Sequence, residues 1–329
     1  MEYVLGIDQG GTKTAAVVMD GEGRILGAGR CGGAYHISDG TDAAMAAIGG
    51  AVKKACGRAG VPLARVGAVG AGVTGADWPE DYGLLRPLIG RATGVADILL
   101  FNDVMGAFYS GTPRGSGAVL CAGTGLNAAV RSPGGEEFVL GFYIDERDQG
   151  GSALAQRAIR LVFQSAIGLE RATGLTGLFL RAAGVQNVDD LLHLFVVDEK
   201  FSRSIKDLVP DIIACAENGD AAAAGLLAEF ASDISRYLRA GLRRFSMLDA
   251  ETDVVLSGSV LKGAKNRLRD DVVRNVLAFA PKAHVIDARF EPVVGAGLAA
   301  LENRPGSAGR ETLWNNVAES AGRFGLERR

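Results

Sequence analysis

The fold of this chain is decided by one glycine-rich stretch near its start, Gly6-Ile7-Asp8-Gln9-Gly10-Gly11-Thr12-Lys13-Thr14. Val, Leu and Ile are frequent on both sides of it, which predicts two strands joined by a tight hairpin corner. The corner leaves backbone N–H groups open to a phosphate, Thr12 and Lys13 add a hydroxyl and a charge, and Asp8 can hold Mg²⁺ through water. Taken alone, the stretch is equally well explained as a glycine-rich turn without a ligand.

Composition limits the classes of protein that the chain can belong to. It has 329 residues, 48% of them hydrophobic, which is enough for two globular domains, and its net charge is −3. The basic residues are dispersed, so we expect neither a nucleic-acid partner nor an anionic membrane surface. No apolar run approaches the ~20 residues of a membrane span, and no signal segment precedes the first strand, so a cytoplasmic protein is expected.

Single residue types add little chemistry. The four cysteines are far apart and form no C-x-x-C pair, which favours buried, reduced thiols over a zinc or iron–sulfur site. The three histidines are scattered, and structural or surface roles are expected for them. Trp78 and Trp314 are isolated aromatics, for which packing roles are expected.

The first hundred residues alternate between strand and helix patterns. Apolar runs predict five strands, at 3–7, 15–19, 24–30, 66–73 and 97–101. Helical spacing appears at 41–58, with Asp39 or Thr41 as the expected cap, and again at 81–92. Three antiparallel strands followed by β-α-β-α units predict a mixed sheet with helices on its faces.

The same order begins again near residue 115. Strands are predicted at 117–122 and 127–131 on either side of a second glycine corner, Gly123-Thr124-Gly125. A helix at 151–167, a largely helical stretch at 175–245 and strands at 253–257 and 283–286 follow. Two similar cores predict a ligand cleft between them. A last helix at 310–324 is expected to pack back on the first domain.

Several motifs come in the order used by one superfamily. They are Gly6–Thr14, the pair Asn102-Asp103, Ala122–Gly125 and Leu256–Val260, supported by Ala216–Asp220 and Glu291–Ala296. In this the chain resembles the actin-like ATPase and sugar-kinase superfamily, and within it the N-acetylglucosamine kinases and the BadF/BadG/BcrA/BcrD-type ATPases. The resemblance covers residue 3 to about residue 301.

The resemblance implies an α/β fold of two ribonuclease-H-like (actin-like ATPase) domains, with a nucleotide cleft between them and a helical insertion in the second. The first domain would comprise residues 1–114, joined by C-terminal helices at 293–329. The second would comprise residues 115–292.

The resemblance also implies site residues for ATP and Mg²⁺. Asp8 would organise Mg²⁺, and Asp103 would be the general base, unless it is only the N-cap of a helix over 104–109. The nucleotide would be bound by Gly10, Gly11, Thr12 and Lys13, by Gly123, Thr124 and Gly125, and by Gly258, Ser259 and Lys262.

The sugar side departs from the family pattern. The implied substrate contacts are Asn102, Asp103, Gly141 and Asp148. N-acetylglucosamine kinases present Gly-Trp-Gly and then Gly-Asp-Glu-Gly-Ser, where this chain has Gly141-Phe142-Tyr143 and Arg147-Asp148-Gln149-Gly150-Gly151-Ser152. The Asn expected in an early sugar-contacting loop is also missing, and the chain reads Gly33-Ala34-Tyr35-His36 there.

The first hypothesis is therefore ATP-dependent phosphorylation of an amino sugar, with N-acetylglucosamine to its 6-phosphate ranked before glucosamine, N-acetylmannosamine and N-acetylmuramic acid. The alternatives are an ATPase activator of an acyl-CoA dehydratase or reductase system, which would need an iron–sulfur cluster, and a nucleotide-binding regulator. Pairing as a homodimer through the Ala-rich segment 221–242 stays open beside an intramolecular core.

Overall fold

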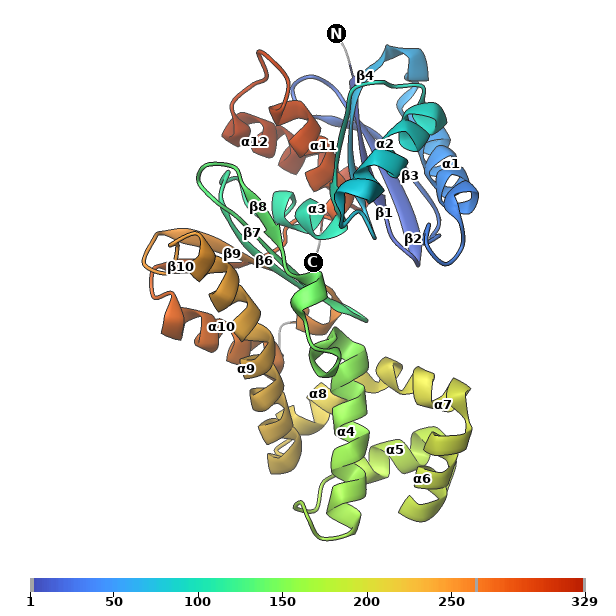
Figure 1. The fold of residues 1–329 in the computed structure, drawn as a ribbon, viewed down its shortest axis with the longest axis vertical. Helices are drawn as coiled ribbons and strands as arrows, with labels where there is room; N and C mark the ends of the chain where they lie inside the picture. Colours follow the sequence, from blue (N-terminus) through green and yellow to red (C-terminus); the bar gives the residue numbers. More distant parts are fainter. Residues whose placement is uncertain (1–2, 264–265, 328–329) are drawn as a thin grey trace. The chain divides into compact units, whose positions relative to one another are not determined.

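The computed structural model describes residues 3–263 and 266–327. The chain divides into two compact units (Figure 1), the first formed by residues 3–119, 133–139 and 286–327 and the second by residues 120–132 and 140–285. Its strands form two five-stranded sheets. The predicted α/β class is confirmed, but β8 (Glu137–Val139) in the second sheet was not predicted.

The first sheet lies wholly within the first unit and has the strand order β3-β2-β1-β4-β5. Strand β1 pairs antiparallel with β2 and parallel with β4, and β4 is parallel to β5. The carboxyl ends of β1, β4 and β5 therefore meet at one edge of the sheet. The strands are β1 (Tyr3–Gln9), β2 (Lys13–Met19), β3 (Ile25–Gly32), β4 (Val66–Val73) and β5 (Ile98–Asn102).

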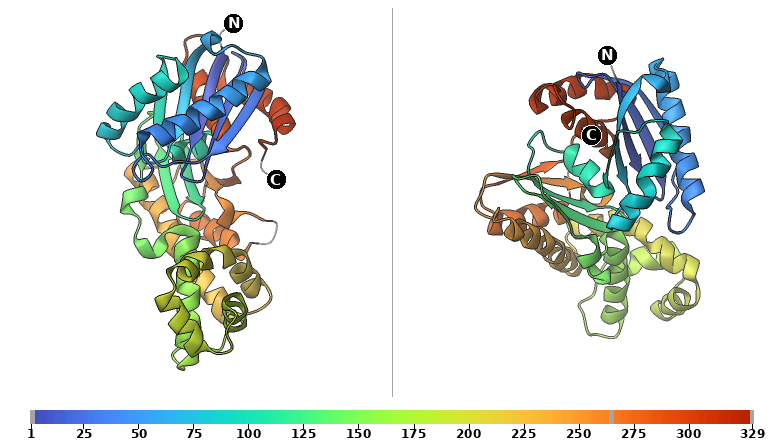
Figure 2. Two further views of the ribbon diagram at one scale, coloured as in Figure 1. Left: turned by 90° about the vertical axis from the view of Figure 1, so that its right-hand side faces the viewer. Right: turned by 45° about the horizontal axis from the view of Figure 1, so that its top comes forward.

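Both faces of this sheet are covered, because successive side chains of a strand point to opposite faces. Ala16 and Val18 of β2 belong to the core under α1 and α2, whereas Val17 and Met19 belong to the core under α11 and α12. Figure 2 shows these helices on the two sides of the sheet. The helices of this unit are α1 (Thr41–Ala59), α2 (Pro79–Thr93), α3 (Asp103–Tyr109), α11 (Pro292–Glu302) and α12 (Arg310–Ala321).

Two glycines let α11 approach the sheet closely. A Cβ at Gly70 of β4 would lie 2.0 Å from the carbonyl oxygen of Ala296, and one at Gly6 of β1 would lie 2.4 Å from that of Val293. Neither distance is compatible with a side chain. Gly6 of the opening stretch therefore serves packing as well as the corner.

The last helix packs as the sequence predicts. Leu313, Trp314 and Val317 of α12 lie in the same core as Val4 and Val17 of the first sheet. The ring of Trp314 contacts that of Phe290, with centroids 5.0 Å apart.

The second sheet has the order β10-β9-β6-β7-β8. Helices α4, α9 and α10 and a helical insertion, α5 to α8, belong to the second unit (Figure 1). The strands are β6 (Gly117–Ala122), β7 (Leu126–Arg131), β8 (Glu137–Val139), β9 (Thr252–Ser257) and β10 (Ala283–Asp287). The helices are α4 (Gly150–Ala166), α5 (Leu175–Ala183), α6 (Val188–Val197), α7 (Glu199–Ser204), α8 (Val209–Glu217), α9 (Ala221–Arg244) and α10 (Arg267–Phe279). The short 3₁₀ segments are η1 (Leu63–Arg65), η2 (Gly141–Tyr143), η3 (Glu146–Asp148), η4 (Ile205–Leu208), η5 (Ser259–Leu261) and η6 (Gly322–Phe324).

Three local predictions were wrong in whole or in part. Helix α1 has Gly40 as its N-cap without a side-chain cap, because the Asp39 carboxylate instead accepts a 2.7 Å hydrogen bond from the backbone N–H of Tyr35. Trp78 is 54% exposed and so is not a core packing group. All four cysteines are free, as expected, but only Cys56 is buried. No helix in the described part of the chain is long and apolar enough to cross a membrane.

Candidate functional site

The first glycine corner is an exposed hairpin turn. The N–H of Gly10 donates to the carbonyl of Lys13 at 2.9 Å, and a Cβ at Gly11 would find its nearest listed neighbour only at 3.9 Å. The ammonium of Lys13 lies 3.5 Å from one carboxylate oxygen of Glu291. The other oxygen of the same carboxylate lies 3.0 Å from the guanidinium group of Arg30. Glu291 is thus a partner of Lys13 that was not predicted, although it begins one of the motifs of the resemblance.

The edge where β1, β4 and β5 end carries Asp8 and Asp103. Asp8 of β1 lies in register with Gly72 of β4, and the Cα of Asp103 lies 3.4 Å from the position that a Cβ at Gly72 would take. Because Gly72 has no side chain, Asp103 can lie close to β4 at the residue that pairs with Asp8 of β1.

Asp103 is not the N-cap of α3, so the alternative interpretation of this residue is wrong. The cap of α3 is Asn102, whose side-chain oxygen accepts a 3.0 Å hydrogen bond from the N–H of Val104. Asp103 is the first residue of the helix. The Asn102 amide also donates to the carboxylate of Asp77 at 2.6 Å, so Asn102 links the helix start to the loop after β4.

The surroundings of Asp103 make it a stronger base than an ordinary carboxylate. Burial raises its pKa to about 6, a hydrogen bond from the side chain of Thr74 opposes that rise, and the Asp77 charge adds to it. A carboxylate with a pKa of about 6 is still ionised at neutral pH and accepts a proton more readily than one near 4. This is the property that a general base needs.

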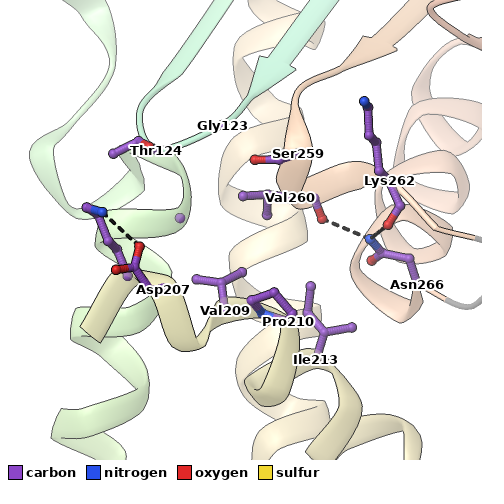
Figure 3. Close-up of a pocket in the computed structure, with 12 residues that line it drawn as sticks. Gly123, Thr124, Asp207, Val209, Pro210, Ile213, Ser259, Val260, Lys262 and Asn266 are labelled. Carbon is purple, nitrogen blue, oxygen red and sulfur yellow. Dashed lines mark hydrogen bonds and ion pairs between the residues drawn. The ribbon is translucent and has the colours of Figure 1, made fainter. Parts of the chain in front are cut away.

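The second unit contains a cavity of about 470 Å³ beside the second glycine corner. Figure 3 shows an apolar wall of Val209, Pro210 and Ile213 facing Val260, with Thr124 at the corner. Its lining residues are Gly123, Thr124, Gly151, Lys206, Asp207, Val209, Pro210, Ile213, Ser259, Val260, Lys262 and Asn266.

The structure brings together four of the predicted nucleotide-binding residues, Gly123, Thr124, Ser259 and Lys262, at this cavity. Gly258 is not among the lining residues, but a side chain at this position would disturb the cavity. Its φ is +94°, and a Cβ on residue 258 would lie 2.1 Å from the carbonyl oxygen of Ala122. The ends of β9 and β6 can therefore meet only at a glycine.

The remaining wall comes from residues that sequence reasoning missed. Val209, Pro210 and Ile213 belong to α8, and the preceding Lys206 and Asp207 form an ion pair at 2.8 Å. These residues follow the corner by more than eighty positions and carry no motif. The one available signal was a proline at the start of a helical pattern, which marks a helix beginning but no ligand.

Asn266 is another missed residue, and it fixes the shape of the cavity. Its amide donates to the carbonyls of Val260 and Lys262, both at 2.8 Å, and its side-chain oxygen caps α10. The segment over 259–262 is therefore held against the start of α10. In Figure 3 the Lys262 side chain extends away from Pro210 and Ile213.

Asp148 lies in an internal ion-pair network. It is 1% exposed, and its carboxylate contacts the guanidinium groups of Arg157 at 2.6 Å and Arg236 at 2.7 Å. The hydroxyl of Tyr237 donates to the same carboxylate at 2.7 Å and accepts from the N–H of Asp145. These protein groups already supply the hydrogen bonds that the sequence analysis expected from sugar hydroxyls.

Its neighbour Gln149 contacts the second glycine corner. The Gln149 side-chain oxygen accepts from the N–H of Leu126 at 3.2 Å. Helix α4 begins at the same place, since the N–H of Gly151 donates to Gly123 and that of Ser152 to Thr124, at 2.8 and 3.0 Å. Gly141, the other predicted sugar contact that lies in the second unit, is next to the Asn127 side chain.

Two five-stranded sheets, each with a glycine corner, form the architecture of an actin-like ATPase fold. The family model described as the BadF/BadG/BcrA/BcrD ATPase family matches residues 5–300. The chain belongs to this ATPase family.

Individual relatives are more distant. The chain is 22% identical over 302 residues to the N-acetylmuramic acid/N-acetylglucosamine kinase of Clostridium acetobutylicum, covering 91% of this chain and 98% of that one. It is 28% identical over 247 residues to the glucosamine kinase GspK of Vibrio cholerae serotype O1, covering 72% and 80%. A solved structure from Chromobacterium violaceum, assigned as an N-acetylglucosamine kinase, superposes with a TM-score of 0.68 at 22% identity, covering 91% and 98%.

Proposed function

We propose that this protein is an ATP-dependent kinase that transfers the γ-phosphoryl group of ATP to a hydroxyl of an amino sugar. The observation that carries the proposal is the carboxylate of Asp103, which stands at the carboxyl edge of the first sheet with a pKa raised to about 6. Family membership supplies ATP as the nucleotide. The names of the relatives make amino sugars the acceptors to test, with N-acetylglucosamine first in the panel.

In this reaction the oxygen of the acceptor hydroxyl forms a bond to the γ-phosphorus, and the bond from that phosphorus to the bridging oxygen of ADP breaks. The hydroxyl proton passes to Asp103, and ADP leaves with the electron pair of the broken bond. Asp103 is suited to this role because it is ionised at neutral pH yet more basic than an exposed aspartate. Its hydrogen bond with Thr74 orients the carboxylate.

On the nucleotide side, the cavity at the second corner fits adenosine. The side chains of Val209, Pro210 and Ile213 offer an apolar wall for the base, and Thr124 and Ser259 offer hydroxyls. Each glycine corner, taken by itself, would offer backbone N–H groups to a phosphate.

Asp8 would hold Mg²⁺ through water. In the described part of the chain no three His, Cys, Asp or Glu side chains converge to hold a metal ion by themselves. Mg²⁺ in kinases needs only one or two carboxylates, because the phosphates and water complete its shell. When bound, it would neutralise charge on the phosphates, and Asp8 is the carboxylate that would orient it.

The test is a coupled assay of ADP release by the full chain with N-acetylglucosamine, glucosamine, N-acetylmannosamine, N-acetylmuramic acid and glucose. Asp103→Asn keeps the shape of the side chain and removes the proton acceptor, so the rate should fall ~10²-fold or more while Mg-ATP binding persists. Asp97→Asn, the same change at an exposed residue before β5, is the matched control and should keep the wild-type rate.

Two outcomes would count against the proposal. Full activity of Asp103→Asn would remove Asp103 as the base. Absence of stimulation by every sugar, with iron present in the purified protein, would favour the ATPase activator instead.

A further inference from the structure

The loop that lacks the family's asparagine, Gly33-Ala34-Tyr35-His36, lies against the same sheet edge as Asp103. The side-chain amide of Gln9, at the end of β1, donates to the carbonyl of Ala34, and the N–H of Thr74 donates to the backbone carbonyl of Gln9 at 2.9 Å. A Cβ at Gly75 would fall within 2.6 Å of the Tyr35 ring and 2.8 Å of the His36 ring. The loop over 33–36 and the turn over 74–77 are therefore packed together.

This edge has buried polar atoms that lack hydrogen-bond partners among the described residues. Gln9 is fully buried, and because its amide nitrogen is turned to Ala34, its oxygen has no donor among the described residues. His36 is 7% exposed, and its Nδ1 has no partner there either. The carboxylates of Asp77 and Asp103 add further acceptors. Buried polar atoms without partners cost free energy, so a ligand that brings hydrogen-bonding groups, with an N–H or O–H for the Gln9 oxygen, fits this edge.

The edge also has an excess of negative charge. Burial and the neighbouring Asp81 raise the pKa of Asp77, and burial together with the charges of Asp77, Asp81 and Asp103 raises the pKa of Tyr35. The charge of Asp81 is already compensated, since its carboxylate accepts from the N–H groups of Asp77 and Trp78 at 3.1 and 2.8 Å, at the start of α2.

The charge of Asp77 is compensated by side chains instead of backbone N–H groups. Its hydrogen-bond donor is the neutral amide of Asn102, and the basic group that lowers its pKa is His36. A positively charged group from a ligand would gain a charge-assisted hydrogen bond here. A neutral amide would gain less, and a carboxylate would be repelled.

Parts of this edge are open to solvent. Tyr35, Asp77 and Asp103 are half-buried, and the residues that follow the two segments, Ile37 and Trp78, are 65% and 54% exposed. A polar floor with an exposed apolar border is the composition expected of a small-molecule site.

We propose that the acceptor sugar carries a free, protonated amine, that Asp77 binds its ammonium group, and that glucosamine-type sugars are therefore preferred over N-acetylated and acidic ones. This inference rests on the proposed kinase function and assigns the substrate class of the same site. It reverses the order suggested by the family resemblance, which places N-acetylglucosamine first.

The experiment compares kcat/KM of the wild-type chain for glucosamine, glucose, N-acetylglucosamine and N-acetylmuramic acid at a pH where the amine is protonated. Glucosamine should exceed glucose by about 10- to 100-fold, the range of one charge-assisted hydrogen bond. N-acetylmuramic acid, which carries a carboxylate, should be the poorest acceptor. The wild-type comparison needs no variant and so does not depend on a variant folding.

Asp77→Asn then tests the residue. It should bring the ratio of glucosamine to glucose close to one, mainly through KM. The matched control, Glu80→Gln, removes the same charge from an exposed residue three positions further on and should keep the wild-type ratio. Thermal melting and Mg-ATP calorimetry check that both variants are folded.

The outcomes separate this inference from the proposed function. A higher kcat/KM for N-acetylglucosamine than for glucosamine, or an unchanged ratio in folded Asp77→Asn, would overturn the assignment of a cationic acceptor while leaving the kinase in place. No ADP release with any sugar would overturn both.

Discussion

Replacing Asp148 should destabilise the second unit and weaken nucleotide binding, although the partners of its carboxylate are not among the residues predicted to bind the nucleotide. Its carboxylate joins η3 to α4 through Arg157 and to α9 through Arg236 and Tyr237. The next residues, Gln149 to Ser152, hold the second glycine corner through hydrogen bonds to residues 123–126. Loosening Asp148 should therefore loosen the corner.

The magnitude follows from the number of contacts and their exposure. Asp148→Asn keeps the shape, but an amide cannot accept from two guanidinium groups and a hydroxyl at once. Each charge-assisted hydrogen bond is worth about 1.5–3 kcal/mol, and removing one partner of a fully buried pair costs about 3–5 kcal/mol. Arg157 and Arg236 keep side-chain exposures of 22% and 54%, so water replaces part of the loss. We expect a net loss of about 2–4 kcal/mol.

For a unit of this size that loss corresponds to a fall in Tm of roughly 5–10 °C. Differential scanning calorimetry of the full chain measures it, and isothermal calorimetry measures the accompanying fall in Mg-ATP affinity. The matched control is Asp145→Asn, which breaks a carboxylate–arginine contact of 3.1 Å with Arg147, whose side chain is 80% exposed. Because exposed pairs contribute little, this control should shift the Tm far less.

Two results would refute the reasoning. One is an equal shift in both variants, which would show that burial of the network does not matter. The other is wild-type Mg-ATP affinity in a clearly destabilised Asp148→Asn, which would separate the network from the glycine corner.

Two further predictions concern the corners and the base. Gly125→Val should sharply weaken Mg-ATP binding while the fold survives, because a Cβ there meets nothing closer than the Gln149 oxygen at 3.7 Å but would stand where phosphates approach the backbone; unchanged affinity by calorimetry would argue against the phosphate-binding role. The activity should rise with pH through about 6 and level off above it, because Asp103 acts only when deprotonated and its pKa is raised; a rate independent of pH between 5 and 7.5 would contradict this.

Much of the fold was predictable because its signals are local. The strands Val66–Val73 and Gly117–Ala122 coincide with the apolar runs in the sequence, since β-branched residues bounded by glycine or a charge mark strand ends well. The second corner, at Gly123–Gly125, was predictable for the same reason. Helix α1 was also found from its spacing, but its cap was not, because the choice between Asp39 and Gly40 depends on a hydrogen bond to Tyr35.

The candidate site was less predictable because its parts are distant in sequence. Pro210 and Ile213 form the cavity wall only because α8 packs beside the second corner. Nothing in the letters around Asp148 shows that Arg236, 88 residues later, will pair with it. Motif resemblance placed Asp148 among the sugar contacts, whereas its burial and its partners are properties of the folded chain.

The positions of Asp148 and Gln149 bear on where sugar selectivity resides. These adjacent side chains point to different partners, Asp148 to arginines of α4 and α9 and Gln149 to the N–H of Leu126 in β7. Both are thus engaged in holding the start of α4 against the second corner. We therefore expect the change from Glu to Gln at position 149 to affect how the second glycine corner is held more than how a sugar is recognised. If the proposed cationic acceptor is right, selectivity lies instead in the first unit, where the oxygen of Gln9 and the Nδ1 of His36 lack partners among the described residues and lie near the carboxylate of Asp77.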